Sequence, residues 1–214
     1  MKFNWKIALA TFIGIVFVAN AGKSQSSNDP ELDQMVKLFL DSLAKSFGPL
    51  NEAQAKSVAQ IVLSFLNYGD RDLRKLSYIL ATAYHESKLL LVKEKRGTPG
   101  TELYNRQEAY WNTNFFGRGF VQLTHERNYK KLGDFLGVDL VRNPDLALDR
   151  VVSADILVAG MINGLFTGVA LSRFIYNAFV DFFNARKVVN GLDRADLIAG
   201  YTASIIKNLE YPIA

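Results

Sequence analysis

The stretch AYHESKLLLVKEKRG, residues 83–97, joins an apolar helical pattern to a cluster of charges. Leu76, Leu80 and Ala83 recur at helical spacing and predict a buried stripe on one helix. Side chains three or four residues apart share a helix face, so the position three residues after Ala83 continues the stripe. That position is Glu86. The sequence therefore predicts a carboxyl group where the next core-facing side chain is expected.

The two glutamates of this stretch have different surroundings. Burial disfavours the charged form of a carboxyl group, and a general acid must keep its proton near neutral pH, so Glu86 suits that role. Glu94 lies between Lys93 and Lys95. Nearby cations favour an ionised carboxylate, which suits a general base. Two carboxyl groups in such opposite environments form the acid/base pattern of glycoside hydrolysis.

The spacing of the pair makes a geometric demand. Eight residues of unbroken helix separate two Cα atoms by ~12 Å, whereas inverting glycosidases hold their carboxyl groups ~6.5–9.5 Å apart. We therefore expect the helix to end or bend before Glu94. The alternative is that neither glutamate is catalytic. Glu86 would then pair with His85 or Lys88 at a helix end, and Glu94 would be a solvated charge.

Composition limits the class of protein. A chain of 214 residues has room for one substantial domain, and a hydrophobic fraction of 49% is ordinary for a globular protein. The formal charge of +4 comes without long runs of like charge, which argues against a nucleic-acid partner. The sequence has no cysteine, so disulfides, thiolate metal sites and a cysteine nucleophile are excluded.

The first residues have the layout of a secretory signal peptide. Lys2 and Lys6 precede an uncharged apolar run, residues 7–18, and small residues follow at 19 and 21. The run is shorter than the ~20 residues that span a bilayer, so an uncleaved anchor is the alternative. We expect a secreted or periplasmic protein with no stable membrane insertion after cleavage. The expected organisation is a signal peptide over 1–21, a linker over 22–30 and one domain over 31–214.

The rest of the chain is predicted to be mainly α. Asn51 and Gly69 have the positions of a helix N-cap and C-cap. Residues 95–120 are rich in Gly, Asn, Thr, Tyr and Trp and predict a loop or a short hairpin. The expected helices are about 30–47, 51–69, 71–85, 125–137, 149–165, 171–189 and 193–209.

A second segment, FFGRGFVQLTHERNY at residues 115–129, decides between the readings. Together with AYHES it resembles glycoside hydrolase family 19, the chitinase family that also includes phage-type endolysins. That family pairs a His-Glu-Thr/Ser helix end with a segment of the form aromatic-Gly-Arg-Gly-x-x-Gln-Leu-Ser/Thr-x-x-x-Asn-Tyr. The resemblance extends from about residue 51 to 201, with further matches at 137–149, 164–168 and 188–196.

The resemblance implies a mainly α, lysozyme-like two-lobed fold with a substrate cleft over residues 31–214. It implies an inverting endo-hydrolase for β-1,4 links in N-acetylglucosamine-containing polymers, with no cofactor and no metal. Glu86 matches the general acid and Glu94 the general base. Thr124 matches a hydroxyl residue that helps to hold the attacking water, since a base and a hydroxyl must converge on that water.

Other residues receive supporting roles from the same resemblance or from their chemistry. The loop aromatics Tyr104, Tyr110 and Trp111 are candidates to line sugar subsites, and local packing is their alternative role. Only seven residues separate the two acids, where plant members have a long loop, so Glu102 and Glu108 remain alternative bases. The expected substrate contacts are Gln122, Asn128, Asn190, Tyr129 and Trp111, and the expected supporting residues are His85, Arg118 and Arg194.

Rival functions are limited. Neither His-Glu pair is followed by a second histidine at zincin spacing, and no Gly-x-Ser-x-Gly element is present. Two alternatives remain beside a chitinase-like glycosidase. One is an endolysin-like muramidase that cuts peptidoglycan, and the other is an inactive carbohydrate-binding protein. In each case we expect a monomer with a polysaccharide partner.

Overall fold

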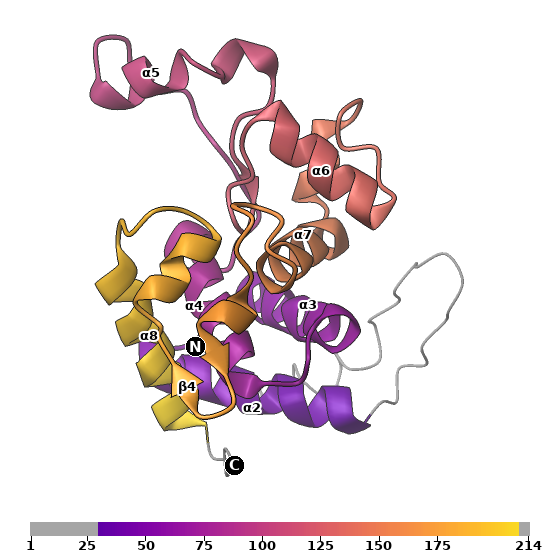
Figure 1. Cartoon of the computed structure of the whole chain (residues 1–214), viewed down its shortest axis with the longest axis vertical. Helices are drawn as coiled ribbons and strands as arrows, with labels where there is room; N and C mark the ends of the chain where they lie inside the picture. The colour runs from indigo at the N-terminus through magenta and orange to yellow at the C-terminus, as the bar shows by residue number, and fades with distance from the viewer. Residues whose placement is uncertain (1–29, 210–214) are drawn as a thin grey trace.

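The computed structural model describes residues 30–209, shown in colour in Figure 1. The expected signal peptide and nearly all of the expected linker lie outside the described residues. No helix within residues 30–209 is both long enough and apolar enough to cross a membrane.

Five long helices form the body of the molecule. α3 packs against α7, and both α4 and α2 pack against α8. α4 is the central element, since Leu76, Ile79, Leu80 and Ala83 on it are all fully buried, as the sequence predicted. The bounds of these helices are α2 (Pro30–Phe47), α3 (Glu52–Tyr68), α4 (Leu73–Ser87), α7 (Arg150–Ile162) and α8 (Ala195–Asn208).

The ends of α3 and α4 follow from local hydrogen bonds. Asn51 and Gln54 form a reciprocal capping box, which confirms the predicted start of α3. Asp72 caps α4 by accepting a hydrogen bond from the Arg74 N–H at 3.0 Å. α4 stops at Ser87 because the next two residues, Lys88 and Leu89, have left-handed backbone angles, with φ of 55° and 61°. The helix therefore ends before Glu94, as the spacing demanded.

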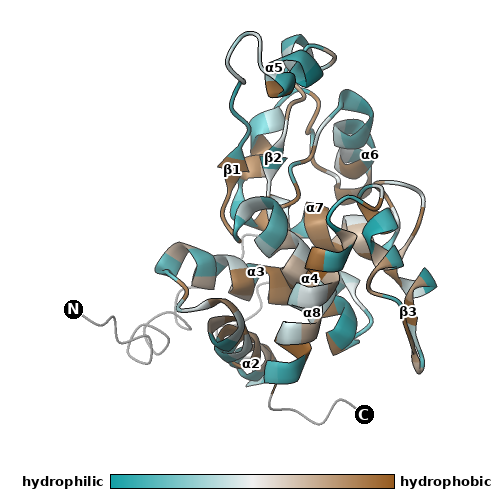
Figure 2. Cartoon of the chain, turned by 90° about the vertical axis from the view of Figure 1, so that its left-hand side faces the viewer, coloured by the Kyte–Doolittle hydropathy of each residue, from teal (hydrophilic) through white to brown (hydrophobic). Residues whose placement is uncertain are grey.

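A smaller part of the molecule is formed by the residues between α4 and α7. Both views show α5 and α6 beyond one end of the helical body, with β1 and β2 leading to them (Figures 1 and 2). β1 pairs antiparallel with β2, with Val92 opposite Gly119 and Lys93 opposite Arg118. The elements are β1 (Val92–Lys93), α5 (Glu102–Gln107), η2 (Trp111–Thr113), β2 (Arg118–Gly119), α6 (Glu126–Leu136) and η3 (Pro144–Leu148). The mainly α fold class, with a small β element in the middle, is confirmed.

One predicted helix is wrong. Residues 171–189 form two short 3₁₀ helices and a hairpin instead, because Asn177 has a left-handed φ of 45° at the hairpin turn. The Asp181 side chain then accepts a hydrogen bond from the Asn184 N–H at 2.9 Å and starts a new turn. The elements are η4 (Leu171–Arg173), β3 (Ile175–Tyr176), β4 (Phe179–Val180) and η5 (Asn184–Val188).

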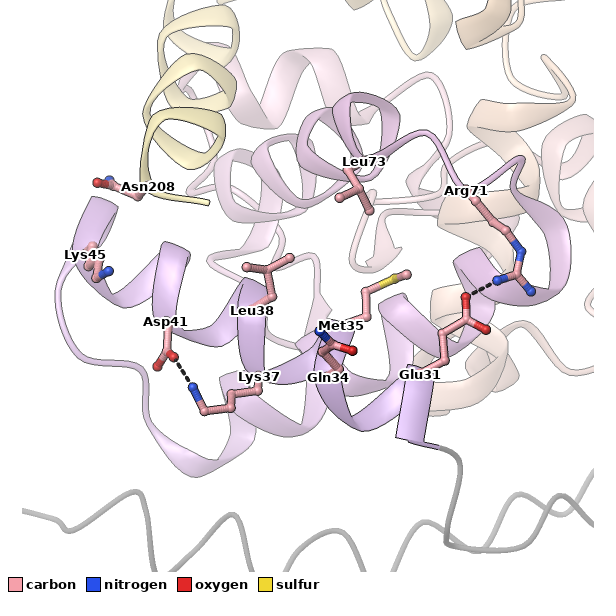
Figure 3. A pocket seen from close by; sticks show the side chains of 10 residues that line it. All are labelled: Glu31, Gln34, Met35, Lys37, Leu38, Asp41, Lys45, Arg71, Leu73 and Asn208. Carbon is pink, nitrogen blue, oxygen red and sulfur yellow. Dashed lines mark hydrogen bonds and ion pairs between the residues drawn. The ribbon is translucent and has the colours of Figure 1, made fainter. Parts of the chain in front are cut away.

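A hollow of about 420 Å³ runs along α2 (Figure 3). The side chains of Met35, Leu38 and Leu73 lie between two ion pairs, Arg71 with Glu31 and Lys37 with Asp41. None of the residues that the sequence assigned to chemistry lines this hollow. The motif residues therefore lie outside this hollow.

Candidate active site

Glu86 lies in the last turn of α4, and its side chain is 19% exposed. Its Oε1 accepts a hydrogen bond from Nη1 of Arg186 at 2.8 Å. Arg186 is only 3% exposed, and its Nε donates to the carbonyl of Asp193 at 3.0 Å. η5 therefore presents a buried guanidinium to the carboxyl group at the end of α4.

This arginine corrects the expectation for Glu86. The stripe of apolar residues did predict a largely buried carboxyl group, but it did not predict a cation beside it. The alternative partner Lys88 points elsewhere, with its Nζ 4.3 Å from the centre of the Tyr84 ring. Arg186 is 100 residues from Glu86 in the chain, and no local pattern distinguished it from the neighbouring basic residue Lys187.

His85, the supporting residue beside Glu86, is half-buried. Burial lowers the pKa of His85 below its ordinary value, and the Arg186 guanidinium acts in the same direction, while the Glu86 carboxyl opposes it. The imidazole is therefore neutral near pH 7. A neutral His85 adds no charge to the Glu86–Arg186 pair.

Glu94 follows β1 and has hydrogen bonds to both of its carboxylate oxygens. Oε1 accepts from Nε2 of Gln107 and from the hydroxyl of Tyr110, both at 2.8 Å. Oε2 accepts from the backbone N–H of Gly117 at 2.7 Å. The backbone N–H of Glu94 also donates to the Gly117 carbonyl at 2.8 Å. Three donors from two separate segments therefore fix the orientation of this carboxylate.

These donors, rather than the flanking lysines, surround the Glu94 carboxylate. Lys93 forms an ion pair with Asp145 at 2.9 Å, and Lys95 is exposed. Burial raises the pKa of Tyr110 to about 12, and the hydrogen bond to Glu94 acts in the same direction. The phenol thus remains a proton donor to Glu94 throughout the physiological range. Neither Lys93 nor Lys95 provides any of these three hydrogen bonds, and their expected influence on Glu94 stays a prediction.

Gly117 is required by the close packing around Glu94. A Cβ atom on residue 117 would lie 2.8 Å from Oε1 of Gln122 and 3.2 Å from Oε2 of Glu94. Real Cβ atoms essentially never show the first distance, and the second would require Glu94 to shift by a few tenths of an ångström. Glycine therefore lets the backbone N–H reach the carboxylate without displacing either side chain. The Gly-Arg-Gly segment of the second motif thus has a direct physical link to Glu94.

The two alternative bases lack such surroundings. The side chain of Glu102 is 86% exposed and lies 3.8 Å from Arg106 on the same helix. Glu108 is 52% exposed and forms an ion pair with Arg96. Neither carboxylate accepts a hydrogen bond from the backbone of the second motif within residues 30–209. The geometry favours Glu94 over both.

Arg118 is a buried structural residue. It is 1% exposed, and its Nε donates to Oδ1 of Asp145 at 2.6 Å. Its Nη1 donates to the carbonyls of Asn114 and Phe116 at 2.9 and 3.1 Å. The guanidinium therefore fixes the backbone on the N-terminal side of Gly117, and the expected electrostatic role becomes one of positioning.

Tyr129 was expected to contact substrate, but the structure places it in the core. It is fully buried, its hydroxyl donates to the Phe116 carbonyl at 2.8 Å, and it accepts from Arg118 at 3.0 Å. Burial raises the pKa of Tyr129 to about 12, so the hydroxyl keeps its proton. The motif tyrosine supports the Gly-Arg-Gly segment from behind and has no surface for a sugar.

Three motif residues lie in the turn between β2 and α6 or in the first turn of α6. The Nε2 of Gln122 donates to the carbonyls of Val92 and Gly119 at 2.9 and 3.0 Å. The Thr124 hydroxyl donates to the Gln122 carbonyl at 2.8 Å, and Nδ2 of Asn128 donates to the Thr124 carbonyl, also at 2.8 Å. Each of the three residues is partly exposed, and each side chain donates at least one hydrogen bond to the backbone.

Three expected residues remain, and they are Trp111, Asn190 and Arg194. Trp111 stacks on Phe116 with ring centroids 4.5 Å apart, next to the second motif. Asn190 is exposed, and its Oδ1 accepts from the Gly191 N–H at 2.8 Å. Arg194 is 64% exposed and lies 3.9 Å from Asp193. Their expected roles with substrate stay predictions.

Sequence reasoning missed two residues of this site. Arg186 and Gln107 hold Glu86 and Glu94, respectively, and neither was a candidate. Tyr110 was expected to line a sugar subsite, whereas it donates directly to the candidate base. Gln107 is fully buried and amphipathic helix patterns say nothing about a buried amide, so only the fold reveals it.

Part of the chain is similar to known chitinases. Residues 81–161 match the family model described as Chitinase class I, which confirms the resemblance to glycoside hydrolase family 19 for that segment. The chain is 56% identical over 45 residues to Chitinase 11 of Oryza sativa subsp. japonica. It is 42% identical over 64 residues to an endochitinase of Solanum tuberosum.

These relatives are matched over a limited part. The match to the rice protein covers 21% of this chain and 16% of the relative, and the match to the potato protein covers 28% and 19%. The chain thus spans less than a fifth of the length of these two relatives. The family-model segment nevertheless includes Glu86, Glu94 and Thr124.

Proposed function

We propose that this chain is a glycoside hydrolase that cleaves β-1,4 links in an N-acetylglucosamine-containing polymer, with chitin as the substrate, by an inverting acid/base mechanism. The observation that carries the proposal is the set of three hydrogen bonds that orients Glu94, within the segment that matches the chitinase model. Glu86 is the general acid and Glu94 the general base.

The three hydrogen bonds to Glu94 leave its carboxylate able to accept the proton of the attacking water. A carboxylate has about four lone-pair positions. Three donors occupy both positions of Glu94 Oε1 and one of Oε2, which leaves one position on Oε2 for the attacking water. Glu94 can then accept a proton without losing a structural hydrogen bond.

Arg186 suits the acid side of the reaction. It occupies Oε1 of Glu86, and Oε2 is then the atom that carries the proton to the leaving glycosidic oxygen. After the transfer Glu86 is a carboxylate, and the guanidinium stabilises the charge that has just developed. A preorganised cation costs no reorganisation at that moment.

The hydroxyl of Thr124 is the proposed second contact for the attacking water. Its one proton is donated to the Gln122 carbonyl, so its oxygen is left as an acceptor for a water proton. A water held between two acceptors, Thr124 and Glu94, directs a lone pair toward the sugar. An inverting mechanism needs this water on the face opposite the leaving group.

The test is product release from N-acetylglucosamine hexamer, chitin and purified peptidoglycan by residues 22–214. We expect cleavage of the hexamer and of chitin, with Glu86→Gln abolishing hydrolysis while sugar binding and the folded state remain. Near-normal activity of Glu86→Gln would refute the assignment. A preference for peptidoglycan would instead support the muramidase reading, and binding without cleavage would support the inactive one.

We also propose export through residues 1–21, on the grounds of the charge and apolar pattern of that segment. Mass spectrometry of the protein recovered from its producing cells tests this proposal. An N-terminus at or near residue 22 is expected. An intact N-terminus would contradict cleavage and favour the anchor.

A further inference from the structure

The β3–β4 hairpin exposes aromatic side chains that the core does not use. Ile175 is fully buried, whereas Tyr176 and Phe179 are 47% and 45% exposed. Their rings pack against each other with centroids 5.0 Å apart. Val180 and Phe183, later in the same segment, are each 39% exposed. Tyr176 and Phe179 are cross-strand partners on one face of the hairpin. We name these two exposed residues the hairpin patch, because their rings offer an apolar surface to a partner.

The hairpin is held firmly in place. The Arg74 Nη1 donates to the Asn177 carbonyl at the turn, at 2.6 Å. The Asp181 N–H donates to the Phe174 carbonyl at 2.8 Å and closes the base of the hairpin. Behind it, Phe182 stacks on the buried Tyr78 with centroids 6.1 Å apart. A partner of the hairpin patch therefore meets rings that are already ordered, which reduces the entropic cost of binding.

A hollow of about 720 Å³ lies beside the hairpin. Residues 176–178 line one side, and the other side is the turn and first residues of α4. The hollow contains neither of the candidate acids, and in both views the hairpin lies away from α5 and α6 (Figures 1 and 2).

The charges that line the hollow cancel in pairs. Arg74 pairs with Asp72 at 2.7 Å, and Lys75 pairs with Asp70. An anionic partner, such as a phosphate or an acidic lipid surface, meets no excess of cations here. The Asp70 side chain is 53% exposed, so its carboxylate can accept hydrogen bonds from the hydroxyl and amide groups of a neutral ligand.

We propose that the hairpin patch and this hollow form a second binding site for a neutral N-acetylhexosamine polymer. The proposal rests on the proposed function for the identity of the polymer. Tyr176 and Phe179 stack against the apolar faces of pyranose rings, and the exposed Asp70 carboxylate accepts hydrogen bonds from hydroxyl and acetamido N–H groups. Such a site holds the enzyme on an insoluble chain and raises the local concentration of cleavable links around Glu86 and Glu94.

The direct test measures binding to insoluble chitin in the Glu86→Gln background, so that the polymer is not consumed. The double variant Tyr176→Ala/Phe179→Ala removes both rings, and Phe135→Ala on α6 is the control because Phe135 is 46% exposed. We expect the double variant to bind roughly tenfold more weakly, since it loses two stacking contacts. The control should stay within about twofold. Equal binding by the double variant and its parent would overturn the proposal.

A second pair of variants guards against misfolding. Tyr176→Leu/Phe179→Leu keeps the hairpin apolar but removes the rings, so it should lose the same affinity with an unchanged circular dichroism spectrum. If the leucine variant binds chitin as tightly as its parent, stacking is not the cause and the proposal fails. A loss that appears only on anionic vesicles, or only as a shift from dimer to monomer in sedimentation, would likewise overturn it.

The test separates this proposal from the proposed function. In the active background the double variant should cleave soluble hexamer at a rate within about twofold of the parent and lose rate only on insoluble chitin. No hexamer cleavage by the wild type would refute the proposed function alone, because hairpin-dependent binding to chitin would still support the second site. Hexamer cleavage together with hairpin-independent chitin binding would refute the second site alone.

Discussion

Gly117→Ala changes one hydrogen atom to a methyl group at the point of closest packing around Glu94. The new Cβ would lie 2.8 Å from Oε1 of Gln122 and 3.2 Å from Oε2 of Glu94. Relief requires both side chains to move by a few tenths of an ångström, and this movement lengthens the hydrogen bond from the backbone N–H of residue 117 to Glu94. The catalytic base would keep its chemistry but lose its alignment.

The magnitude follows from two contributions. Overpacking a close-packed site costs about 1–3 kcal/mol of folding free energy. A catalytic group displaced by ~1 Å costs about 100-fold in rate, so a displacement of a few tenths of an ångström should cost roughly tenfold. We expect Gly117→Ala to lower kcat about tenfold on N-acetylglucosamine hexamer, with KM within about twofold, because the substrate contacts remain.

Gly200→Ala is the matched control. A Cβ on Gly200 meets nothing within 4 Å, and the residue lies inside α8 with helical neighbours on both sides. Alanine in a helix interior stabilises by about 0.5–1 kcal/mol relative to glycine, so Tm should rise and kcat should not change. The assays are steady-state kinetics and thermal unfolding by circular dichroism. Wild-type kcat in a folded Gly117→Ala protein would refute the reasoning that the Gly117 contact aligns Glu94.

Three further predictions test one donor to Glu94 and two partners of the buried Arg118. Tyr110→Phe removes one donor to the Glu94 carboxylate. Because a hydrogen bond to a charged group contributes ~1.5–3 kcal/mol, kcat should fall at least about tenfold in steady-state assays. An unchanged kcat would contradict the role of Tyr110. The hydrogen bond from Lys93 holds the pKa of Asp145 below its ordinary value, so this carboxylate stabilises the fold above its unfolded-state pKa and loses that contribution as pH falls through its folded-state value. Urea unfolding should therefore show Asp145→Asn less stable than wild type at pH 7 and closer to it in acid, and a gap that widens in acid would refute the linkage. Tyr129→Phe leaves the buried Arg118 with one acceptor fewer and should lower the free energy of unfolding by ~1–3 kcal/mol in the same assay, whereas wild-type stability would contradict its structural role.

The elements that could be predicted from sequence are those with local causes. Asn51 and Gly69 bound α3 because the capping box and the C-terminal hydrogen bond form within a few residues. The apolar stripe of α4 is as deeply buried as its period implied. The end of α4 before Glu94 also followed from sequence, although its cause, two left-handed residues after Ser87, did not.

The features that could not be predicted have two causes: local turns that interrupt a helix period, and contacts between residues far apart in the chain. The apolar residues of 171–189 match a helix period, but the turn at Asn177 and the cap at Asp181 favour a hairpin. Arg186 reaches Glu86 only because η5 packs beside the end of α4. A motif position also does not separate contact from support, and Tyr129, which matched a family residue, is fully buried.

The stereochemistry of the first product tests the central claim most directly. Proton NMR of freshly cleaved N-acetylglucosamine hexamer distinguishes the two anomers before they interconvert. With Glu86 as acid and Glu94 as the base that activates water, the β-linked substrate should yield the α-anomer first, and Glu86→Gln and Glu94→Gln should each abolish its formation. A β-anomer as the first product, or undiminished cleavage by folded Glu94→Gln, would contradict the account.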